Sequence, residues 1–259
     1  MSTRFYISSC CESGGVYLCE LTDTGELTII EKTALPSPMY TVIHEERLYI
    51  ILRAPFEGSD TSGILSAKIG TDGRLTDLTE CTPTDGIVAC HLCVNENGIY
   101  TANYVSGSIK KLGGNLIVRH GSGPNKVRQD KAHMHYVTAM PDGNILTCDL
   151  GCDAVAVYDK DFTSLISEAR VPEGHGARHL AVAGDNETVW CINELASTIT
   201  RLKYDGKLTS ESTFELYPGR DITGTTAAAI RLSADGKTLY ASNRGIDLIT
   251  AVDISGDTP

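Results

Sequence analysis

Residues 120–158 read HGSGPNKVRQDKAHMHYVTAMPDGNILTCDLGCDAVAVY and contain three of the seven histidines of the chain. Short apolar runs with near-alternating polarity lie on both sides of a Pro-Asp-Gly turn, a pattern that predicts a β-hairpin. Histidine, arginine and lysine residues flank these runs, so polar chemistry is concentrated on one hairpin. We expect the loops of this hairpin to supply the largest share of a binding site.

The overall composition is that of an ordinary soluble globular protein. The chain has 259 residues, of which 41% are hydrophobic and 21% charged, and we expect one domain over residues 1–259. It contains 25 glycines but only four phenylalanines and one tryptophan. This combination favours β-structure with many turns over a helical bundle.

The charge balance indicates a small ligand. A formal net charge of −11 and a pI near 5.0, with no basic stretch, argue against nucleic acid or an anionic membrane as partner. An anionic ligand would have to be held by a local cluster of arginine and histidine. The N-terminus lacks a signal-peptide pattern and no apolar run reaches about 18 residues, so we expect a cytoplasmic protein.

The nine cysteines are scattered mostly singly, as is typical of small buried residues in a reducing compartment. Cys90 and Cys93 form a C-x-x-C pair, but a second pair at metal-ligand spacing is missing. In a strand, their side chains would point to opposite faces. We therefore expect no metal and no other cofactor.

An apolar pair that opens a strand recurs six times, at intervals of 43 to 51 residues. Four of the pairs follow a turn-forming cluster, which joins a preceding strand to the one that carries the pair. A period of roughly 47 residues is typical of propeller blades. The pairs are Phe5-Tyr6, Leu48-Tyr49, Ile99-Tyr100, Ile145-Leu146, Val189-Trp190 and Leu239-Tyr240.

Each repeat also contains a third and a fourth predicted strand. The third follows the apolar pair, for example at residues 154–158 and 198–204, and a Gly-x-Leu turn leads into the fourth. Residues 160–170 have a weak helical spacing, but they occupy the position between the third and fourth strands and lack caps. Four antiparallel strands make one propeller blade.

Counted in this way, the chain enters at the second strand of its first blade and leaves after the third strand of its sixth. We expect an all-β fold, a β-propeller with about five and a half blades visible. A complete seven-bladed ring would need about 70 more residues. Our expectation is therefore a shortened chain whose C-terminal blade is missing.

In an antiparallel blade, the start of the first strand and the end of the second lie at the same edge. These positions from all blades should surround one mouth of the central channel. Nothing in β-propensity requires polar residues there, so their presence predicts a binding site. The residues at these positions are His91, Asn103, Tyr104, His133, His135, Asp149, Asp153, His175, Arg178, His179, Asn193, Glu194, Asn243 and Arg244.

The same residues also have structural interpretations. A histidine at a strand start commonly caps backbone groups or packs against the next blade, and Asn103-Tyr104 could simply hold adjacent blades together. Asp149 and Asp153 flank a glycine in a spacing typical of turns, so we expect them to accept hydrogen bonds from backbone amides. Arg178 could pair with Glu194 or bind an anionic ligand, and both alternatives stay open.

Six sequence motifs fall on these positions and on the loops beside them: HGSGPNKVRQ, HMH, DLGCDAVAVY, GHGARHL, NEL and NRG. Together they resemble the lactonase family of seven-bladed propellers, which includes propeller-type 6-phosphogluconolactonases and carboxymuconate lactonising enzymes. The resemblance extends over nearly the whole chain. Ala177 stands where a proline is more usual in the family, a change that should not affect the adjacent arginine.

The resemblance implies hydrolysis of 6-phospho-D-glucono-1,5-lactone to 6-phosphogluconate in the pentose phosphate pathway, with a small anionic sugar lactone as the partner molecule. It places the catalytic residues on His133 or His135, Arg178, Glu194 and Arg244. The expected substrate-binding residues are His91, Asn103, Arg128, His179 and Asn193.

Lactone hydrolysis needs a general base for water and positive charge for the developing oxyanion. In our hypothesis, Glu194 or His135 takes the proton from water and Arg178 stabilises the carbonyl oxygen. The phosphate would be held by Arg244 together with Arg128 or His179.

Two other functions fit the same sequence. A cycloisomerase or another lactonase would use the arginine pair for a substrate carboxylate, and assays on phosphogluconolactone and on muconates would separate these reactions. A non-catalytic binding propeller is the other alternative, and it predicts no rate above the spontaneous opening of the lactone. The oligomeric state stays open at the level of sequence.

Overall fold

The computed structural model describes residues 2–56 and 58–256, which form strands, turns and bends with no helix among them. Accordingly, the described part of the chain has no helix with the length and apolarity needed to cross a bilayer. The strands are β1 (Ser2–Ser9), β2 (Gly15–Thr22), β3 (Leu27–Ala34), β4 (Pro38–His44), β5 (Arg47–Leu52), β6 (Gly63–Ile69), β7 (Leu75–Thr76), β8 (Thr82–Pro83), β9 (Ala89–Asn95), β10 (Gly98–Asn103), β11 (Ser108–Lys111), β12 (Leu116–Val118), β13 (Met134–Ala139), β14 (Ile145–Asp149), β15 (Ala154–Tyr158), β16 (Leu165–Arg170), β17 (Ala177–Val182), β18 (Thr188–Asn193), β19 (Thr198–Tyr204), β20 (Leu208–Glu215), β21 (Thr226–Leu232), β22 (Thr238–Arg244) and β23 (Leu248–Asp253).

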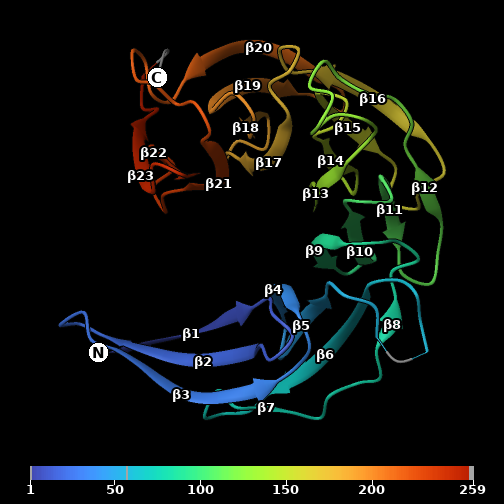
Figure 1. Ribbon diagram of the computed structural model, residues 1–259, viewed down its shortest axis with the longest axis vertical. Coiled ribbons are helices and arrows are strands. Elements are labelled where there is room, and N and C mark those ends of the chain that lie inside the picture. Colours follow the sequence, from blue (N-terminus) through green and yellow to red (C-terminus); the bar gives the residue numbers. More distant parts are fainter. Residues whose placement is uncertain (1, 57, 257–259) are drawn as a thin grey trace.

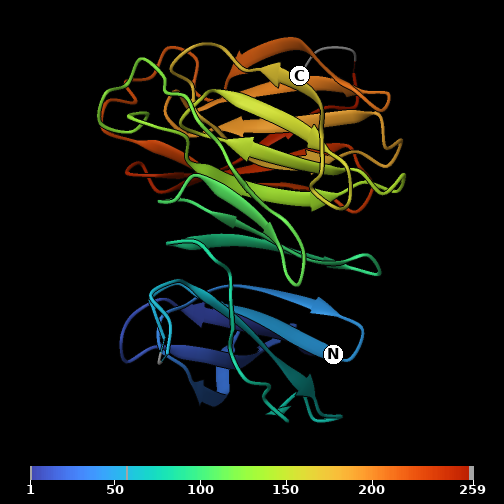
Figure 2. The same cartoon turned by 90° about the vertical axis from the view of Figure 1, so that its right-hand side faces the viewer.

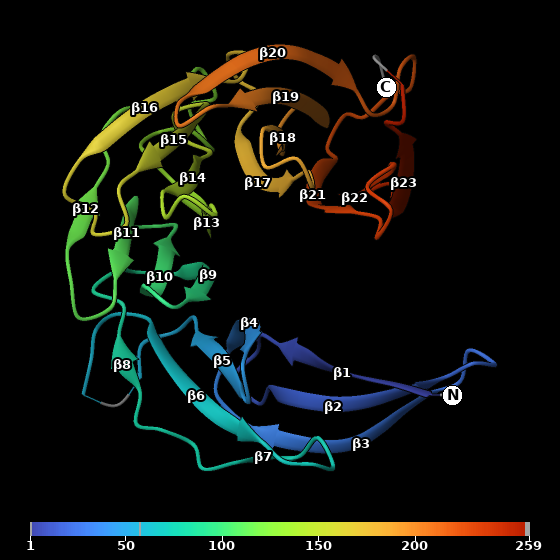
Figure 3. The same cartoon turned by 180° about the vertical axis from the view of Figure 1, so that it is seen from behind.

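These strands form six antiparallel sheets that follow one another around an arc, as Figure 1 shows from one side and Figure 3 from behind. Seen from the edge, the N-terminal sheets lie at one end of the molecule and the C-terminal sheets at the other (Figure 2). We call the sheets blades 1 to 6. They comprise β1–β3, β4–β8, β9–β12, β13–β16, β17–β20 and β21–β23, respectively.

The strand pattern predicted from the repeat is confirmed. The six apolar pairs lie in β1, β5, β10, β14, β18 and β22, and the strands β15 and β19 have the predicted bounds. Residues 165–170 form the outermost strand of blade 4. Blade 1 begins with a second strand and blade 6 ends with a third, so each has three strands in the described residues. The all-β propeller fold is thus confirmed, with six sheets in the part of the chain that the structure describes.

The middle blades are packed on both faces, because each lies between two neighbours. Every residue of β14 and β15 is buried. In a strand with one solvated face, buried and exposed residues would alternate. Leu146 and Val155 of blade 4 share a core cluster with Leu180 and Val189 of blade 5. Burial of each such side chain contributes about 1.5–3 kcal/mol. This packing fixes the relative positions of the loops at the blade edges.

A β-bulge lies near the start of the innermost strand in each of blades 2 to 6. The extra, unpaired residue is Cys90 in blade 3, His135 in blade 4 and Arg178 in blade 5. An extra residue interrupts the alternation of a strand and redirects its side chain. The bulges therefore reorient His135 and Arg178 at the point where the blades converge.

Candidate active site

The carboxylate of Glu194 is the centre of the polar cluster at one mouth of the channel. Glu194 follows directly after β18, and its backbone joins two blades: its N–H donates to the carbonyl of Gly176 (2.8 Å), and its carbonyl accepts from the N–H of Ala227 (3.0 Å). Its side chain is only 2% exposed. A buried carboxylate requires positive partners, and the neighbouring elements supply them.

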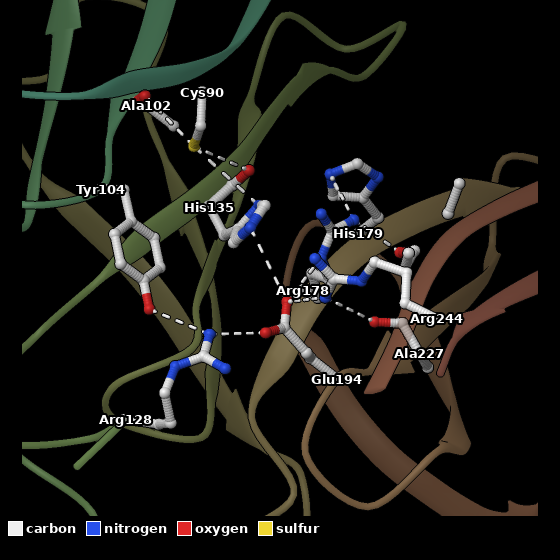
Figure 4. Close-up of polar contacts among 12 residues, drawn as sticks. Cys90, Ala102, Tyr104, Arg128, His135, Arg178, His179, Glu194, Ala227 and Arg244 are labelled. Atoms are coloured by element: carbon white, nitrogen blue, oxygen red, sulfur yellow. Dashed lines mark hydrogen bonds and ion pairs between the residues drawn. The ribbon is translucent and has the colours of Figure 1, made fainter. Parts of the chain in front are cut away.

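Three arginines contact Glu194, and they come from three different blades or loops (Figure 4). Nε of Arg178 lies 2.7 Å from Oε2, and Nη2 of Arg244 lies 3.1 Å from the same oxygen. Nη2 of Arg128, from the loop that precedes β13, lies 2.5 Å from Oε1. Three guanidinium groups on one carboxylate leave a formal surplus of two positive charges. The cluster can therefore accept an anionic ligand.

The arginines keep Glu194 ionised. Burial by itself raises the pKa of Glu194, but Arg178, Arg128 and Arg244 outweigh this effect and lower the pKa below its ordinary value. Burial lowers the pKa of Arg178, although the charge of Glu194 opposes that shift. Both oxygens of Glu194 already accept hydrogen bonds from arginine. Glu194 thus acts first as the group that holds the arginines together.

His135 is the histidine that faces Glu194. Its Nε2 lies 3.9 Å from Oε2 of Glu194, and its Nδ1 lies 3.9 Å from Sγ of Cys90. Burial, followed by the charge of Arg178, holds the pKa of His135 well below its ordinary value, so the imidazole is neutral at pH 7. Burial also raises the pKa of Cys90 to about 12, which keeps the thiol protonated.

His133, the other histidine of the H-x-H pair, supports the wall of the site. Its ring stacks on Tyr104 at 4.4 Å, and its Nδ1 lies 3.0 Å from the carbonyl oxygen of Tyr104. Its Nε2 lies 2.9 Å from Oδ1 of Asp130. The hydroxyl of Tyr104 in turn accepts a hydrogen bond from Nη2 of Arg128 (3.3 Å). Of the two alternatives that the sequence left open, only His135 contacts Glu194.

His179 lies behind Arg178. Nη1 of Arg178 donates to Nε2 of His179 (3.2 Å) and to the carbonyl of Ala228 (2.6 Å). Burial, with the charge of Arg178 next, holds the pKa of His179 well below its ordinary value, so the ring is neutral and can accept this bond. His91 lies deeper in the channel, with its ring centroid 5.3 Å from that of His179. His179 therefore positions Arg178, and His91 lies outside the cluster.

Asn103 and Asn193, which we predicted to bind substrate, do not join the cluster. The side-chain N–H groups of Asn103 donate to the carbonyl of Thr84 (3.3 Å) and to Oγ of Ser108 (3.2 Å). Those of Asn193 donate to hydroxyl groups of the neighbouring strand β19, both at 2.9 Å. Both residues are completely buried. Their amides hold the blade edges together, because a buried amide must find partners within the protein.

The two aspartates serve the structural role expected from their turn spacing. Oδ1 of Asp149 accepts from the backbone N–H of His133 (2.9 Å) and of Cys152 (3.2 Å). Asp153 accepts from the backbone N–H groups of Gly174 (2.8 Å) and Gly176 (2.6 Å). Asp153 thereby ties blade 4 to the loop that leads into Arg178. Among residues 2–56 and 58–256, no group of three or more histidine, cysteine, aspartate or glutamate side chains is placed to hold a metal ion.

Two contacts of the cluster were missed at the level of sequence: Tyr104 as the partner of Arg128, and Cys90 as the neighbour of His135. A signal for Tyr104 was present. Tyr104, Glu194 and Arg244 each follow an asparagine at the end of the second strand of a blade. The residue directly after that asparagine is thus a site position in three blades.

Comparison with known proteins agrees with this fold. The family model described as "Lactonase, 7-bladed beta-propeller" matches residues 4–259. The uncharacterized protein YwcC of Lactococcus lactis is 34% identical over 94% of this chain and 75% of its own length. The uncharacterized protein SERP1457 of Staphylococcus epidermidis is 30% identical over 94% of this chain and 75% of its own.

Solved structures show the same architecture. A protein from Lactobacillus plantarum has a TM-score of 0.84 and 27% identity, over 98% of this chain and 82% of its own. A Bacteroides fragilis protein with the provisional name 6-phosphogluconolactonase has a TM-score of 0.83 and 26% identity, over 98% of this chain and 77% of its own. From the family match and these relatives, we conclude that the chain belongs to the lactonase family of seven-bladed β-propellers.

Proposed function

We propose that this protein hydrolyses 6-phospho-D-glucono-1,5-lactone to 6-phosphogluconate. The main support is the surplus of two positive charges around Glu194 in a chain of net charge −11. A phosphate ester carries about −1.5 to −2 charges at pH 7, which matches this surplus. The provisional name of the Bacteroides fragilis relative supports the same substrate. A cytoplasmic location and a place in the pentose phosphate pathway stay predictions.

In the proposed reaction, His135 is the general base. A water oxygen attacks the lactone carbonyl carbon while the neutral imidazole of His135 takes one proton from that water. The carbonyl oxygen becomes an oxyanion, and Arg178 stabilises it. The bond between this carbon and the ring oxygen then breaks, and the ring oxygen receives the proton from His135. The products are a carboxylic acid, which ionises in water, and a free hydroxyl group.

His135 suits the base role better than Glu194. Glu194 has a lowered pKa and uses both oxygens to bind arginines, so proton uptake would break the cluster. His135 is neutral at pH 7, and among the described residues its Nε2 atom makes no hydrogen bond, with Oε2 of Glu194 3.9 Å away. A water molecule near that nitrogen would meet an available lone pair.

Arg128 and Arg244 are the residues we propose for the phosphate. Their side chains are 36% and 53% exposed, whereas that of Arg178 is 12% exposed. A dianionic group can thus meet Arg128 and Arg244 from the solvent side without entering the buried part of the cluster. His179 is engaged with Arg178, so we remove it from the phosphate-binding set.

The test is the rate of lactone opening by the purified chain, compared with the spontaneous rate in the same buffer. We expect acceleration with 6-phosphogluconolactone and a much lower kcat/KM with glucono-1,5-lactone, which lacks the phosphate. Arg244→Gln should lower the ratio of kcat/KM for 6-phosphogluconolactone to kcat/KM for glucono-1,5-lactone. Arg201→Gln is the matched control, because Arg201 forms an ion pair with Glu211 within blade 5 and should leave the preference unchanged.

Failure of the chain to exceed the spontaneous rate would reject a lactonase and favour a binding module. The same cluster could instead hold a carboxylate, so lactones and muconates with a carboxyl group belong in the assay. A higher kcat/KM on these than on phosphogluconolactone would reject our substrate and favour a lactonase or cycloisomerase for carboxylated compounds.

A further inference from the structure

A cavity of about 420 Å³ lies farther along the innermost strands, toward the turns that join them to the second strands. It is lined by residues of β4, β9, β13, β17 and β21, that is, by the first strands of blades 2 to 6. Its size falls in the range of small-molecule pockets, about 300–1,000 Å³. The residues used below are Tyr40, His91, Tyr136, Leu180, Ile230 and Arg231.

This cavity is distinct from the Glu194 cluster. None of the residues that contact Glu194 through their side chains is among those that line it. In β17, Arg178 faces Glu194, whereas residues 180–182 line the cavity. The rings of Tyr136, His91 and His179 contact one another between the two regions, with centroid distances of 4.0 to 5.3 Å.

The lining of the cavity is mostly apolar and contains one formal charge. Aliphatic side chains such as Leu180 and Ile230 make up much of its lining, and Arg231 is the one charged residue among the described residues that line it. Nη2 of Arg231 donates to the hydroxyl of Tyr40 (3.2 Å), and Nη1 donates to the carbonyl of Ile230 (2.7 Å). No ion pair joins Arg231 to a carboxylate in the described part of the chain.

The other titratable groups of the lining leave this positive charge uncompensated. Burial raises the pKa of Tyr136, so its phenol stays neutral. Burial also raises the pKa of the Cys93 thiol, which stays protonated at pH 7. In a chain with a net charge of −11, the one formal charge in the lining of this mostly apolar cavity is thus positive.

His91 supplies a buried hydrogen-bond donor without an acceptor. The backbone N–H of Val137 points at Nδ1 of His91 at 3.4 Å, so that nitrogen accepts and the proton of the neutral ring is on Nε2. Burial holds the pKa of His91 well below its ordinary value, which keeps the ring neutral. Nε2 is buried and has no hydrogen-bond partner in the described residues. Such orphaned donors are rare in native proteins, and this one lies in the wall of the cavity with no accessible surface of its own.

We propose that this cavity binds a compact organic monocarboxylate with a flat apolar body, such as an aromatic acid. The carboxylate pairs with Arg231, and the apolar body lies against the rings of Tyr40 and Tyr136 and against Leu180 and Ile230. Arg231 favours a planar carboxylate because its guanidinium donates two parallel hydrogen bonds. The inference goes beyond the proposed function, since it requires no lactone hydrolysis.

Isothermal titration of the full chain with benzoate at pH 7 tests the proposal, with benzamide as an uncharged ligand of the same shape. We expect one benzoate per chain and binding of benzamide weaker by about tenfold or more, which corresponds to the loss of one charge-assisted contact. Arg231→Gln should weaken the binding of benzoate by the same factor. Arg231 is exposed, so this variant should fold.

Arg244→Gln is the matched control, since it removes an arginine from the other mouth of the channel. The benzoate affinity of this variant should stay within about twofold of that of the unmodified chain. Three results would overturn the proposal. The first is an absence of benzoate binding to the unmodified chain. The second is equal affinity for benzamide. The third is loss of binding in Arg244→Gln with retention in Arg231→Gln, which would locate benzoate at the Glu194 cluster.

Discussion

At the scale of single residues, the site depends on how two side chains leave their strands. His135 and Arg178 are the extra residues of β-bulges, so each leaves the regular alternation of its strand. Glu194 then gathers Arg178 with two arginines from distant parts of the chain. Roles assigned to these residues can be tested one substitution at a time.

Arg178→Ala should lower kcat/KM for 6-phosphogluconolactone by about two orders of magnitude or more, because it removes the proposed donor to the oxyanion. The loss should appear mainly in kcat, since the contact strengthens as the oxyanion forms. The measurement is steady-state kinetics corrected for spontaneous opening, with Arg201→Ala as control. Activity retained in Arg178→Ala would exclude this arginine from the mechanism.

The pH dependence of kcat/KM should reflect His135 as a base. Its pKa is held well below the ordinary value near 6.5 by burial, with Arg178 next and Arg244 contributing. A base works when unprotonated, so activity should stay constant down to about pH 6.5 and decline only in more acidic solution. Arg244→Gln removes one positive neighbour and should move this decline to higher pH. An unchanged profile in that variant would argue against His135 as the base.

At the scale of structural elements, the loop before β17 is held by the neighbouring blade. Asp153 accepts hydrogen bonds from Gln129 (2.8 Å), Gly174 (2.8 Å) and Gly176 (2.6 Å). It is buried, so water cannot readily replace it. The position of Arg178, two residues after Gly176, therefore depends on a carboxylate in blade 4.

Asp153→Ala should lower the melting temperature and also kcat/KM. Two buried donors and one partly buried donor lose their acceptor, each at about 1–3 kcal/mol. The expected loss is at least about 3 kcal/mol, or at least about 6 °C for a chain of this size. Asp185→Ala is the comparison, because Asp185 accepts three hydrogen bonds in an exposed turn at the opposite blade edge. The Asp185→Ala variant should have a free energy of unfolding lower by about 1 kcal/mol and an unchanged kcat/KM. Equal effects of the two variants would contradict the role given to Asp153.

At the scale of the whole molecule, the channel concentrates buried neutral histidines. His91, His135 and His179 are each at most 8% exposed, and burial holds each pKa well below its ordinary value. In the unfolded chain these groups titrate near pH 6.5. Below that pH the unfolded chain therefore binds more protons than the folded chain, and acid favours unfolding.

The free energy of unfolding should accordingly be constant above about pH 6.5 and decrease as the pH falls below it. Each histidine contributes up to about 1.4 kcal/mol per pH unit. Urea denaturation at about pH 7.5 and 5.5 measures the change, and carboxylates interfere little because they titrate in more acidic solution. His91→Gln should reduce the pH slope by about a quarter to a third, because burial also lowers the pKa of His175. A stability that does not change over this interval would refute the prediction.

Much of the fold could be predicted from the sequence. The period near 47 residues, the turn clusters and the apolar pairs located the second, third and fourth strands of the blades, because these signals are local and repeat in every blade. The order of these strands in an antiparallel blade indicated which residues lie at the mouth of the channel. Arg178, Glu194 and Arg244 do meet there.

Only the tertiary structure separated site residues from supporting ones. The sequence by itself determined that His133, His135, Asn193 and Glu194 lie at one blade edge, because the start of the first strand and the end of the second meet at the same edge of an antiparallel blade. It could not show that His135 faces Glu194 while Asn193 turns into its own blade. That distinction depends on bulges, and a bulge is defined by pairing between two strands. The partners of Glu194 come from as far as 66 residues away in the chain, and packing between blades, which no local pattern encodes, brings them together.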